Sequence, residues 1–253
     1  MTSIKIKSIH KSYLGKKVLE DVSMDFGNGI CFCLLGKNGV GKSTLLNIIG
    51  DLILPDSGDI IINKMYYKNN YVEIKKNLGF LPENLPIIEE LTALQFLNLI
   101  GKLHSINKYE LKDRIDSLVE IFFEGDMSNN KLISQYSYGM KMKISFCASV
   151  IHKPDILILD EPFKGWDPVS VNCLIDFINN YQNEKRIIIL SSHDLNYVER
   201  VATHIGVLSD KKIVFNSTLT MFKQIANNKI DDSLLKILNY QKIDSKGISW
   251  IYD

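Results

Sequence analysis

The sequence LLGKNGVGKSTLLNIIG, residues 34–50, contains two glycines five positions apart, followed at once by Lys42 and Ser43. A continuously apolar run, ICFCLL at 30–35, leads into it, as is typical of a strand buried on both faces. TLLNII at 44–49 predicts a helix that ends at Gly50. A glycine-rich loop between a buried strand and a helix is the context in which backbone N–H groups and a helix N-terminus bind phosphate. Lys42 is expected to reach the phosphates, and Ser43 to ligate Mg²⁺.

Two further apolar runs end in residues that can do chemistry. ILILDEP (156–162) ends in the carboxylates Asp160 and Glu161, and IIILSSHD (187–194) ends in His193. Ligands of open parallel sheets bind at the carboxyl ends of the strands, so these side chains are expected beside the glycine loop. Asp160 is placed to complete a Mg²⁺ shell, Glu161 to polarise a water, and His193 to meet the terminal phosphate.

The remaining pattern predicts an α/β fold. Residues 1–30 alternate apolar and polar positions and predict antiparallel strands, whereas residues 90–150 read as helical. Thr92 with Gln95 matches a capping box that opens a helix through about Leu103. Strands that alternate with helices favour a mostly parallel sheet.

Composition excludes several classes of protein. The 253 residues carry 30 basic and 29 acidic side chains, so no global field favours nucleic acid, and nucleic acid is not expected as a partner. No apolar stretch approaches the roughly 18 residues needed to cross a bilayer. The four cysteines lie in apolar surroundings and are interpreted as buried, reduced thiols of a cytosolic protein: Cys31, Cys33, Cys147 and Cys173.

The ordered motifs resemble the ATP-binding cassette of ABC transporters. The glycine loop is followed by a helical insert, YSYGM (136–140), LILDEP, GWD (165–167) and SSHD, and the resemblance runs from about residue 3 to 217. It implies a P-loop NTPase fold of the ABC ATPase type. The expected parts are a mostly parallel core sheet, an N-terminal antiparallel β subdomain and a helical subdomain at about 85–150. Residues 218–253 are expected to form a C-terminal helical tail.

The resemblance also implies roles for individual residues. The positions of the family's catalytic residues are occupied by Lys42, Glu161 and His193. The residues expected to ligate Mg²⁺ are Asp160, Ser43 and Glu83. Tyr13 matches the aromatic that stacks on adenine, and Ser137 and Gly139 match the signature that contacts ATP held by a second cassette. The phosphate loop comprises Gly36, Lys37, Asn38, Gly39, Val40, Gly41, Lys42, Ser43 and Thr44.

Several positions depart from the family pattern. Tyr138 replaces a signature glycine, and its bulk is expected to face the nucleotide interface. Glu83, in GFLPEN (79–84), stands where glutamine is usual, and a carboxylate still ligates Mg²⁺. Phe163 and Lys164 replace a small polar pair, and the sequence offers no physical reason for that change.

The resemblance implies a cytoplasmic ATPase that works with a second cassette, in a homodimer or heterodimer. The ATPase is expected to power an integral membrane permease. It is expected to lie on the inner face of the cell membrane because it is bound to that permease. GFLPEN, ELTALQFL and YGMKMK are similar to exporters of drugs, peptides and lantibiotics of the ABC-2 kind. Two alternatives stay open. One is a weakly hydrolysing or regulatory cassette, which Tyr138 favours, and the other is a soluble ABC ATPase that takes no part in transport.

Overall fold

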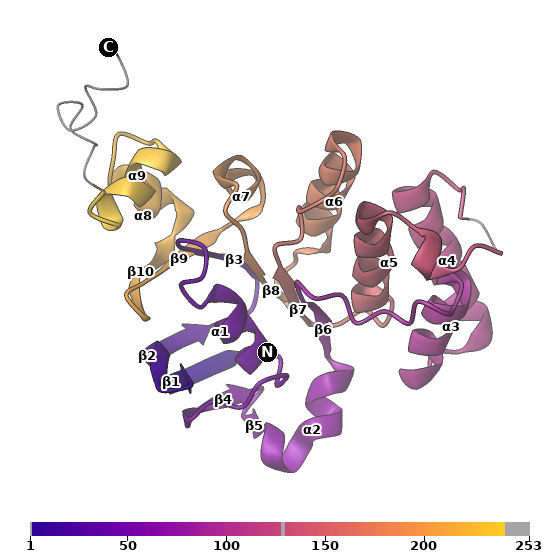
Figure 1. The fold of residues 1–253 in the computed structure, drawn as a ribbon, viewed down its shortest axis with the longest axis horizontal. Helices are drawn as coiled ribbons and strands as arrows, with labels where there is room; N and C mark the ends of the chain where they lie inside the picture. Colours follow the sequence, from indigo (N-terminus) through magenta and orange to yellow (C-terminus); the bar gives the residue numbers. More distant parts are fainter. Residues whose placement is uncertain (1, 128–129, 241–253) are drawn as a thin grey trace.

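The structure, a computed structural model, describes residues 2–127 and 130–240 and contains two β-sheets (Figure 1). The first sheet is antiparallel, with strand order β2-β1-β4-β5. Its bounds are β1 Ile4–Tyr13, β2 Lys16–Phe26, β4 Ser57–Ile62 and β5 Met65–Tyr66. The antiparallel strands predicted within residues 1–30 are therefore confirmed.

The second sheet has six strands in the order β10-β9-β3-β8-β7-β6. Every neighbouring pair in it is parallel except β9 with β10. Its bounds are β3 Ile30–Leu35, β6 Leu78–Leu81, β7 Ile156–Asp160, β8 Ile187–Ser191, β9 His204–Ser209 and β10 Lys212–Thr218. The mostly parallel core sheet was predicted, and the three apolar runs form its central strands.

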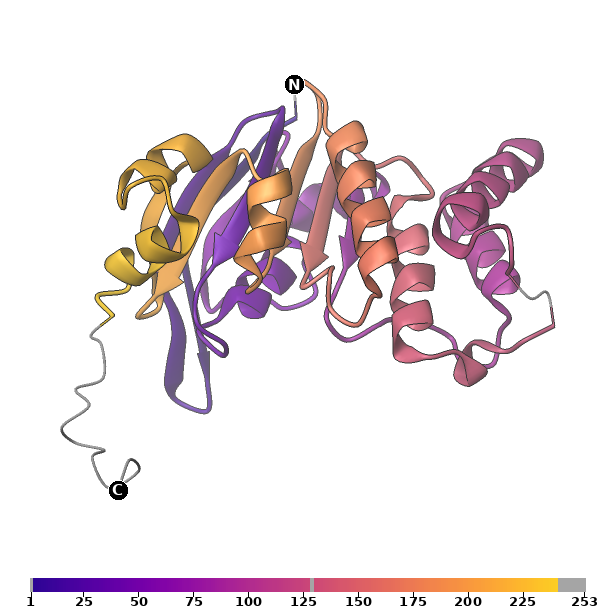
Figure 2. The ribbon, with the colours of Figure 1, turned by 90° about the horizontal axis from the view of Figure 1, so that it is seen from above.

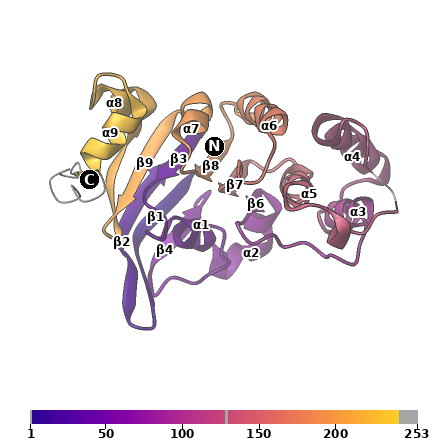
Figure 3. The ribbon, with the colours of Figure 1, turned by 45° about the horizontal axis from the view of Figure 1, so that its top comes forward.

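Helices cover both faces of the six-stranded sheet (Figure 3). Helices α6 (Pro168–Tyr181) and α7 (Leu195–Val201) lie on one face, and α1 (Lys42–Ile49) lies on the other, on the same side as α2 (Tyr67–Lys76). Because side chains alternate along a strand, β3 contributes to two cores. Cys31, Cys33 and Leu35 join the core beneath α6, whereas Phe32 and Leu34 join the core beneath α1.

A helical group projects from one end of the molecule (Figure 2). It contains α3 (Ala93–Leu103), α4 (Lys108–Phe123), the 3₁₀ turn Ile133–Gln135 and α5 (Tyr138–Val150). The predicted capping box is confirmed: the Thr92 hydroxyl accepts from the Gln95 N–H, and the Gln95 side chain accepts from the Thr92 N–H.

Two short helices, α8 (Leu219–Gln224) and α9 (Ile230–Ile237), lie at the opposite end (Figure 1). Phe222 of α8 is fully buried and packs edge-to-face on Phe215 of β10, with ring centroids 5.4 Å apart. The predicted tail therefore begins with residues that join the main core, and its residues 241–253 lie outside the described part of the chain. The division at residue 217 stays a prediction.

The expectation that all four cysteines are buried is wrong at one position. Cys31, Cys33 and Cys147 are buried, but Cys173 is half-buried. It lies between the buried Leu174 and the exposed Asn172 on α6, at the margin of the helix face that packs on the core. All four are free thiols.

Candidate functional site

The strand register brings the predicted motifs to one edge of the six-stranded sheet. Leu159 of β7 lies opposite Leu81 of β6 and Leu190 of β8, and β8 in turn pairs in parallel with β3. The loops that leave the carboxyl ends of these strands therefore emerge side by side. They carry the glycine loop, Glu83, the Asp160–Glu161 pair and His193.

The glycine loop has the backbone that its sequence requires. Gly36 has φ +152°, and a Cβ there would lie 2.4 Å from the Leu208 carbonyl oxygen. Gly41 has φ +114° and is the N-cap of α1, so the first N–H groups of that helix open toward the loop. Lys42 is 6% exposed, and its ammonium donates to the Gly36 carbonyl at 2.9 Å. This arrangement is an anion-binding cradle with one fixed cation.

Asp160 lies beneath the cradle and is 1% exposed. Its Oδ1 accepts from the Ser191 hydroxyl at 2.5 Å, whereas its Oδ2 is buried and has no hydrogen-bond partner among the described residues. Burial raises the pKa of the Asp160 carboxyl, and the hydroxyls of Ser191 and Ser43 oppose that shift. A buried carboxylate oxygen without a partner, next to a serine hydroxyl, is a donor set that fits Mg²⁺.

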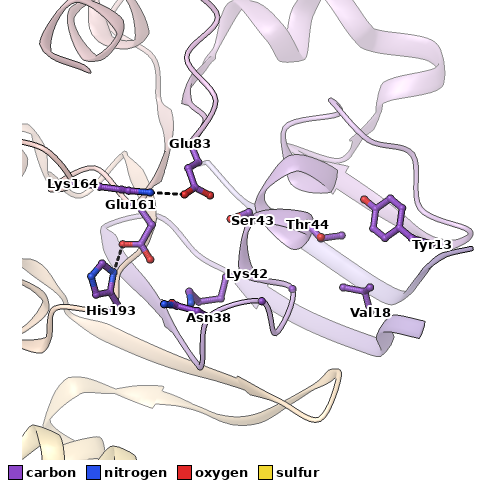
Figure 4. A pocket seen from close by; sticks show the side chains of 12 residues that line it. Tyr13, Val18, Asn38, Lys42, Ser43, Thr44, Glu83, Glu161, Lys164 and His193 are labelled. Carbon is purple, nitrogen blue, oxygen red and sulfur yellow. Dashed lines mark hydrogen bonds and ion pairs between the residues drawn. The ribbon is translucent and has the colours of Figure 1, made fainter. Parts of the chain in front are cut away.

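Glu161 and His193 are in direct contact. The His193 Nδ1 lies 2.8 Å from the Glu161 Oε2 (Figure 4). Glu161 has φ +50°, in the left-handed region that non-glycine residues rarely occupy, and its N–H donates to the Ser191 hydroxyl at 2.9 Å. Such strain at a cavity wall is typical of functional positions. It aims the carboxylate into the cavity, where a water or hydroxyl could be polarised.

Glu83 and Lys164 form an ion pair, with Lys164 Nζ 2.9 Å from Glu83 Oε1 (Figure 4). The hydrogen bond and charge of Glu83 raise the pKa of Lys164. The sequence offered no explanation for a lysine at position 164. Its ion pair with Glu83 explains why a positive side chain stands there. Only the three-dimensional proximity of two segments 81 residues apart could have revealed it.

These side chains line a cavity of about 660 Å³ (Figure 4). Tyr13, 43% exposed, and His193 lie at opposite ends of it. Val18 and Lys164 line the cavity as well, although the sequence analysis assigned neither of them to the site. The full lining comprises Tyr13, Val18, Asn38, Gly39, Gly41, Lys42, Ser43, Thr44, Glu83, Glu161, Lys164 and His193.

The cavity is formed without the predicted signature residues. Ser137 is the N-cap of α5, where its hydroxyl accepts from the Met140 N–H at 3.3 Å. Gly139 packs on the loop after β7, because a Cβ there would lie 2.3 Å from the Gly165 carbonyl oxygen. Neither residue lines the cavity. The other predicted site residues that are not among its lining are Gly36, Lys37, Val40 and the buried Asp160.

The geometry agrees with comparisons with known proteins. Residues 19–164 match the model of the ABC transporter family, which is more than half of the chain. An uncharacterized ABC transporter ATP-binding protein of Methanocaldococcus jannaschii is 35% identical over 83% of this chain and 76% of its own length. The chain belongs to the ABC transporter family of ATP-binding proteins.

Other comparisons place the cassette in the same family. The linearmycin resistance ATP-binding protein LnrL of Bacillus subtilis is 30% identical over 86% of this chain and 70% of its own length. The solved structure of an ATP-binding subunit of an ABC transporter superposes with a TM-score of 0.86 at 26% identity, covering 93% of this chain and 99% of that subunit. The predicted ABC ATPase fold is confirmed, and the cassette is the ATP-binding and ATP-hydrolysing component of an ABC transporter.

No helix within residues 2–127 and 130–240 combines the length and the apolar character that crossing a membrane requires.

Proposed function

We propose that this cassette binds ATP with Mg²⁺ in the cavity at the carboxyl edge of its six-stranded sheet, and that Glu161 activates the attacking water. The observation that carries the proposal is the convergence of Lys42, Glu161 and His193, from the segments that follow three different strands, on one cavity beside the glycine cradle. Lys42 and the N-terminus of α1 hold the phosphates by charge and by backbone N–H groups. His193 orients Glu161 through its 2.8 Å contact and faces the terminal phosphate.

Mg²⁺, when bound, neutralises the β- and γ-phosphate charge that develops during hydrolysis. Ser43 and the unpartnered Oδ2 of Asp160 are the oxygens that would hold it, with Glu83 as a further carboxylate at the cavity wall. Tyr13, exposed at the opposite end of the cavity from His193, would stack on the adenine ring.

A second cassette would complete each site. Ser137 and Gly139 lie at the N-terminus of α5, outside the cavity of their own chain, although a helix N-terminus attracts an anion. This placement supports a head-to-tail pair in which each signature contacts the ATP held by the other chain. We take residues 1–217 as the functional cassette, with the projecting helices at about 85–150 as its coupling subdomain.

The partner in the membrane would be a permease that exports its substrate from the cytoplasm. The relatives named for linearmycin resistance in Bacillus subtilis and for lantibiotic transport in Streptococcus pyogenes support this choice. The cassette would then sit on the inner face of the membrane, held there by the permease.

The test is the mass in solution of Glu161→Gln with and without ATP and Mg²⁺. Without its base the cassette is expected to bind ATP and accumulate as a dimer, which light scattering detects as a doubled mass. Adding Lys42→Ala to the same chain should weaken ATP binding and lower the fraction of dimer at a given ATP concentration together. A monomer that binds ATP would contradict self-pairing and would favour a heterodimer or a weakly hydrolysing cassette.

A further inference from the structure

The ion pair between Glu83 and Lys164 joins two segments that leave neighbouring strands. Glu83 comes two residues after the end of β6 and Lys164 four residues after the end of β7, and Leu81 lies opposite Leu159 where those strands end. The pair is 2.9 Å long, and both side chains are about half exposed at the cavity wall. It therefore bridges the strand–helix linker of the projecting helices to the segment that carries Glu161.

Lys164 is also tied to Glu161 through the backbone. The Lys164 N–H donates to the Glu161 carbonyl at 3.1 Å, which closes a tight turn over residues 161–164. The turn begins at the strained φ of +50° at Glu161. A contact that fixes the end of this turn at Lys164 also limits how its beginning can move.

The same segment is held from a second side by the signature helix. Gly165 has φ +79°, and a Cβ there would lie 2.7 Å from Cδ1 of Tyr138. The Tyr138 ring thus covers the Cα of Gly165 in its own chain, and Tyr138 is 46% exposed. Three positions that depart from the family pattern, Glu83, Tyr138 and Lys164, consequently meet around one turn.

The charges around the cavity indicate what the Glu83–Lys164 pair does. The cavity is lined by two carboxylates, Glu83 and Glu161, and by two lysines, Lys42 and Lys164, while Asp160 is buried at the end of β7. A free Glu83 would repel a triphosphate, whereas a Glu83 neutralised by Lys164 does not. Its oxygens remain able to turn to a cation that arrives with the phosphates.

We propose that Lys164 is a positioning residue that neutralises Glu83 and anchors the Glu161 turn, so that the site keeps a second carboxylate for the metal, beside Asp160, without its charge opposing the nucleotide. This inference rests on the nucleotide and magnesium site proposed above. It makes Glu83 and Lys164 one unit, in which the loss of either charge is repaired by the loss of the other.

The experiment measures the affinity of the full chain for the non-hydrolysable analogue AMP-PNP, once in EDTA and once with excess Mg²⁺. Lys164→Gln should weaken binding of the metal-free analogue about tenfold but change binding of its magnesium complex less than about threefold, because an exposed Glu83 repels four charges and attracts the metal. Glu83→Gln should shift the metal-free affinity in the opposite direction. The double variant Glu83→Gln/Lys164→Gln should return close to the wild-type ratio, and Lys164→Arg should keep it.

Lys223→Gln is the matched control, since it removes a lysine paired with Glu199 away from the cavity, and its ratio should equal that of the wild type. If Lys164→Gln weakens both forms of the analogue equally, or if the double variant keeps the full loss of metal-free affinity seen in Lys164→Gln, the inference is overturned and the nucleotide site stands. A wild-type chain that binds neither form would overturn both the inference and the proposed site.

Discussion

The imidazole Nδ1 of His193 lies 2.8 Å from Oε2 of Glu161, on loops that follow neighbouring parallel strands. The contact leaves the imidazole 60% exposed and the carboxylate 13% exposed, so the histidine covers the carboxylate and still faces solvent and ligand. The pair gives Glu161 a fixed direction into the cavity.

Replacing His193 with Ala should lower the kcat of ATP hydrolysis by about 100-fold and change the KM for ATP less than about threefold. The physical reason is that Glu161 loses its orienting contact, while the cradle that binds the phosphates is untouched. Steady-state phosphate release measures both constants. His10→Ala, in the antiparallel sheet, serves as the control, and a normal kcat in His193→Ala would contradict the assigned role.

Lys42→Ala should weaken ATP binding by roughly 10–100-fold, because charge-assisted hydrogen bonds contribute about 1.5–3 kcal/mol. The ammonium is held in the cradle by the Gly36 carbonyl, ready for the phosphates. Fluorescence titration with a labelled ATP analogue would measure the loss. Lys64→Ala, an exposed lysine between β4 and β5, should bind ATP as the wild type does, and equal affinity in the two variants would argue against the cradle.

Ser191→Ala should destabilise the fold by about 1–3 kcal/mol, since it removes the partner of the buried Asp160 Oδ1 and of the part-buried Glu161 N–H. The Ser191 hydroxyl donates to Asp160 Oδ1 and accepts from the Glu161 N–H. Urea unfolding gives the free energy. Ser149→Ala is a matched control, because the buried Ser149 hydroxyl only donates to a carbonyl of its own helix, Phe146, and should cost less. Equal losses of unfolding free energy in the two variants would show that the Ser191 hydrogen bonds contribute no more to stability than the Ser149 bond.

The stability of the cassette should fall as the pH falls from about 6.5 to about 4. Burial, together with the neighbouring His104 ring 3.8 Å away, lowers the pKa of His152 to about 4. The unfolded chain then binds a proton in a range where the folded chain does not, so the stabilisation present above pH 6.5 is lost on acidification. A flatter profile in His152→Gln, compared with His10→Gln, would support the assignment, and parallel profiles would contradict it.

Much of the site could be predicted because parallel strands end at one edge. The runs before Gly36, Asp160 and His193 are buried on both faces, so their apolar composition identified them as strands of one sheet. Because the motifs come directly after these strands, their place at one edge of the sheet could be predicted from the sequence. The antiparallel strands near the N-terminus and the Thr92 cap were equally local signals.

The sequence did not predict which side chains from distant segments contact each other. Ser191 lies opposite Asp160 in the register of β7 and β8, and Lys164 meets Glu83 across two loops. Ser191 could have been found by aligning the ends of the two apolar runs. Lys164 could not, because the geometry of a turn decides where its side chain reaches.

The most direct test of the central claim is phosphate release at saturating ATP and Mg²⁺ by the wild type and by Glu161→Gln, with ATP affinity measured on the same samples. The account predicts turnover in the wild type, a loss of about 10²–10⁴-fold in the variant, and an ATP affinity that changes less than about threefold. Turnover in Glu161→Gln at the wild-type rate would contradict it, because another group would then activate the water.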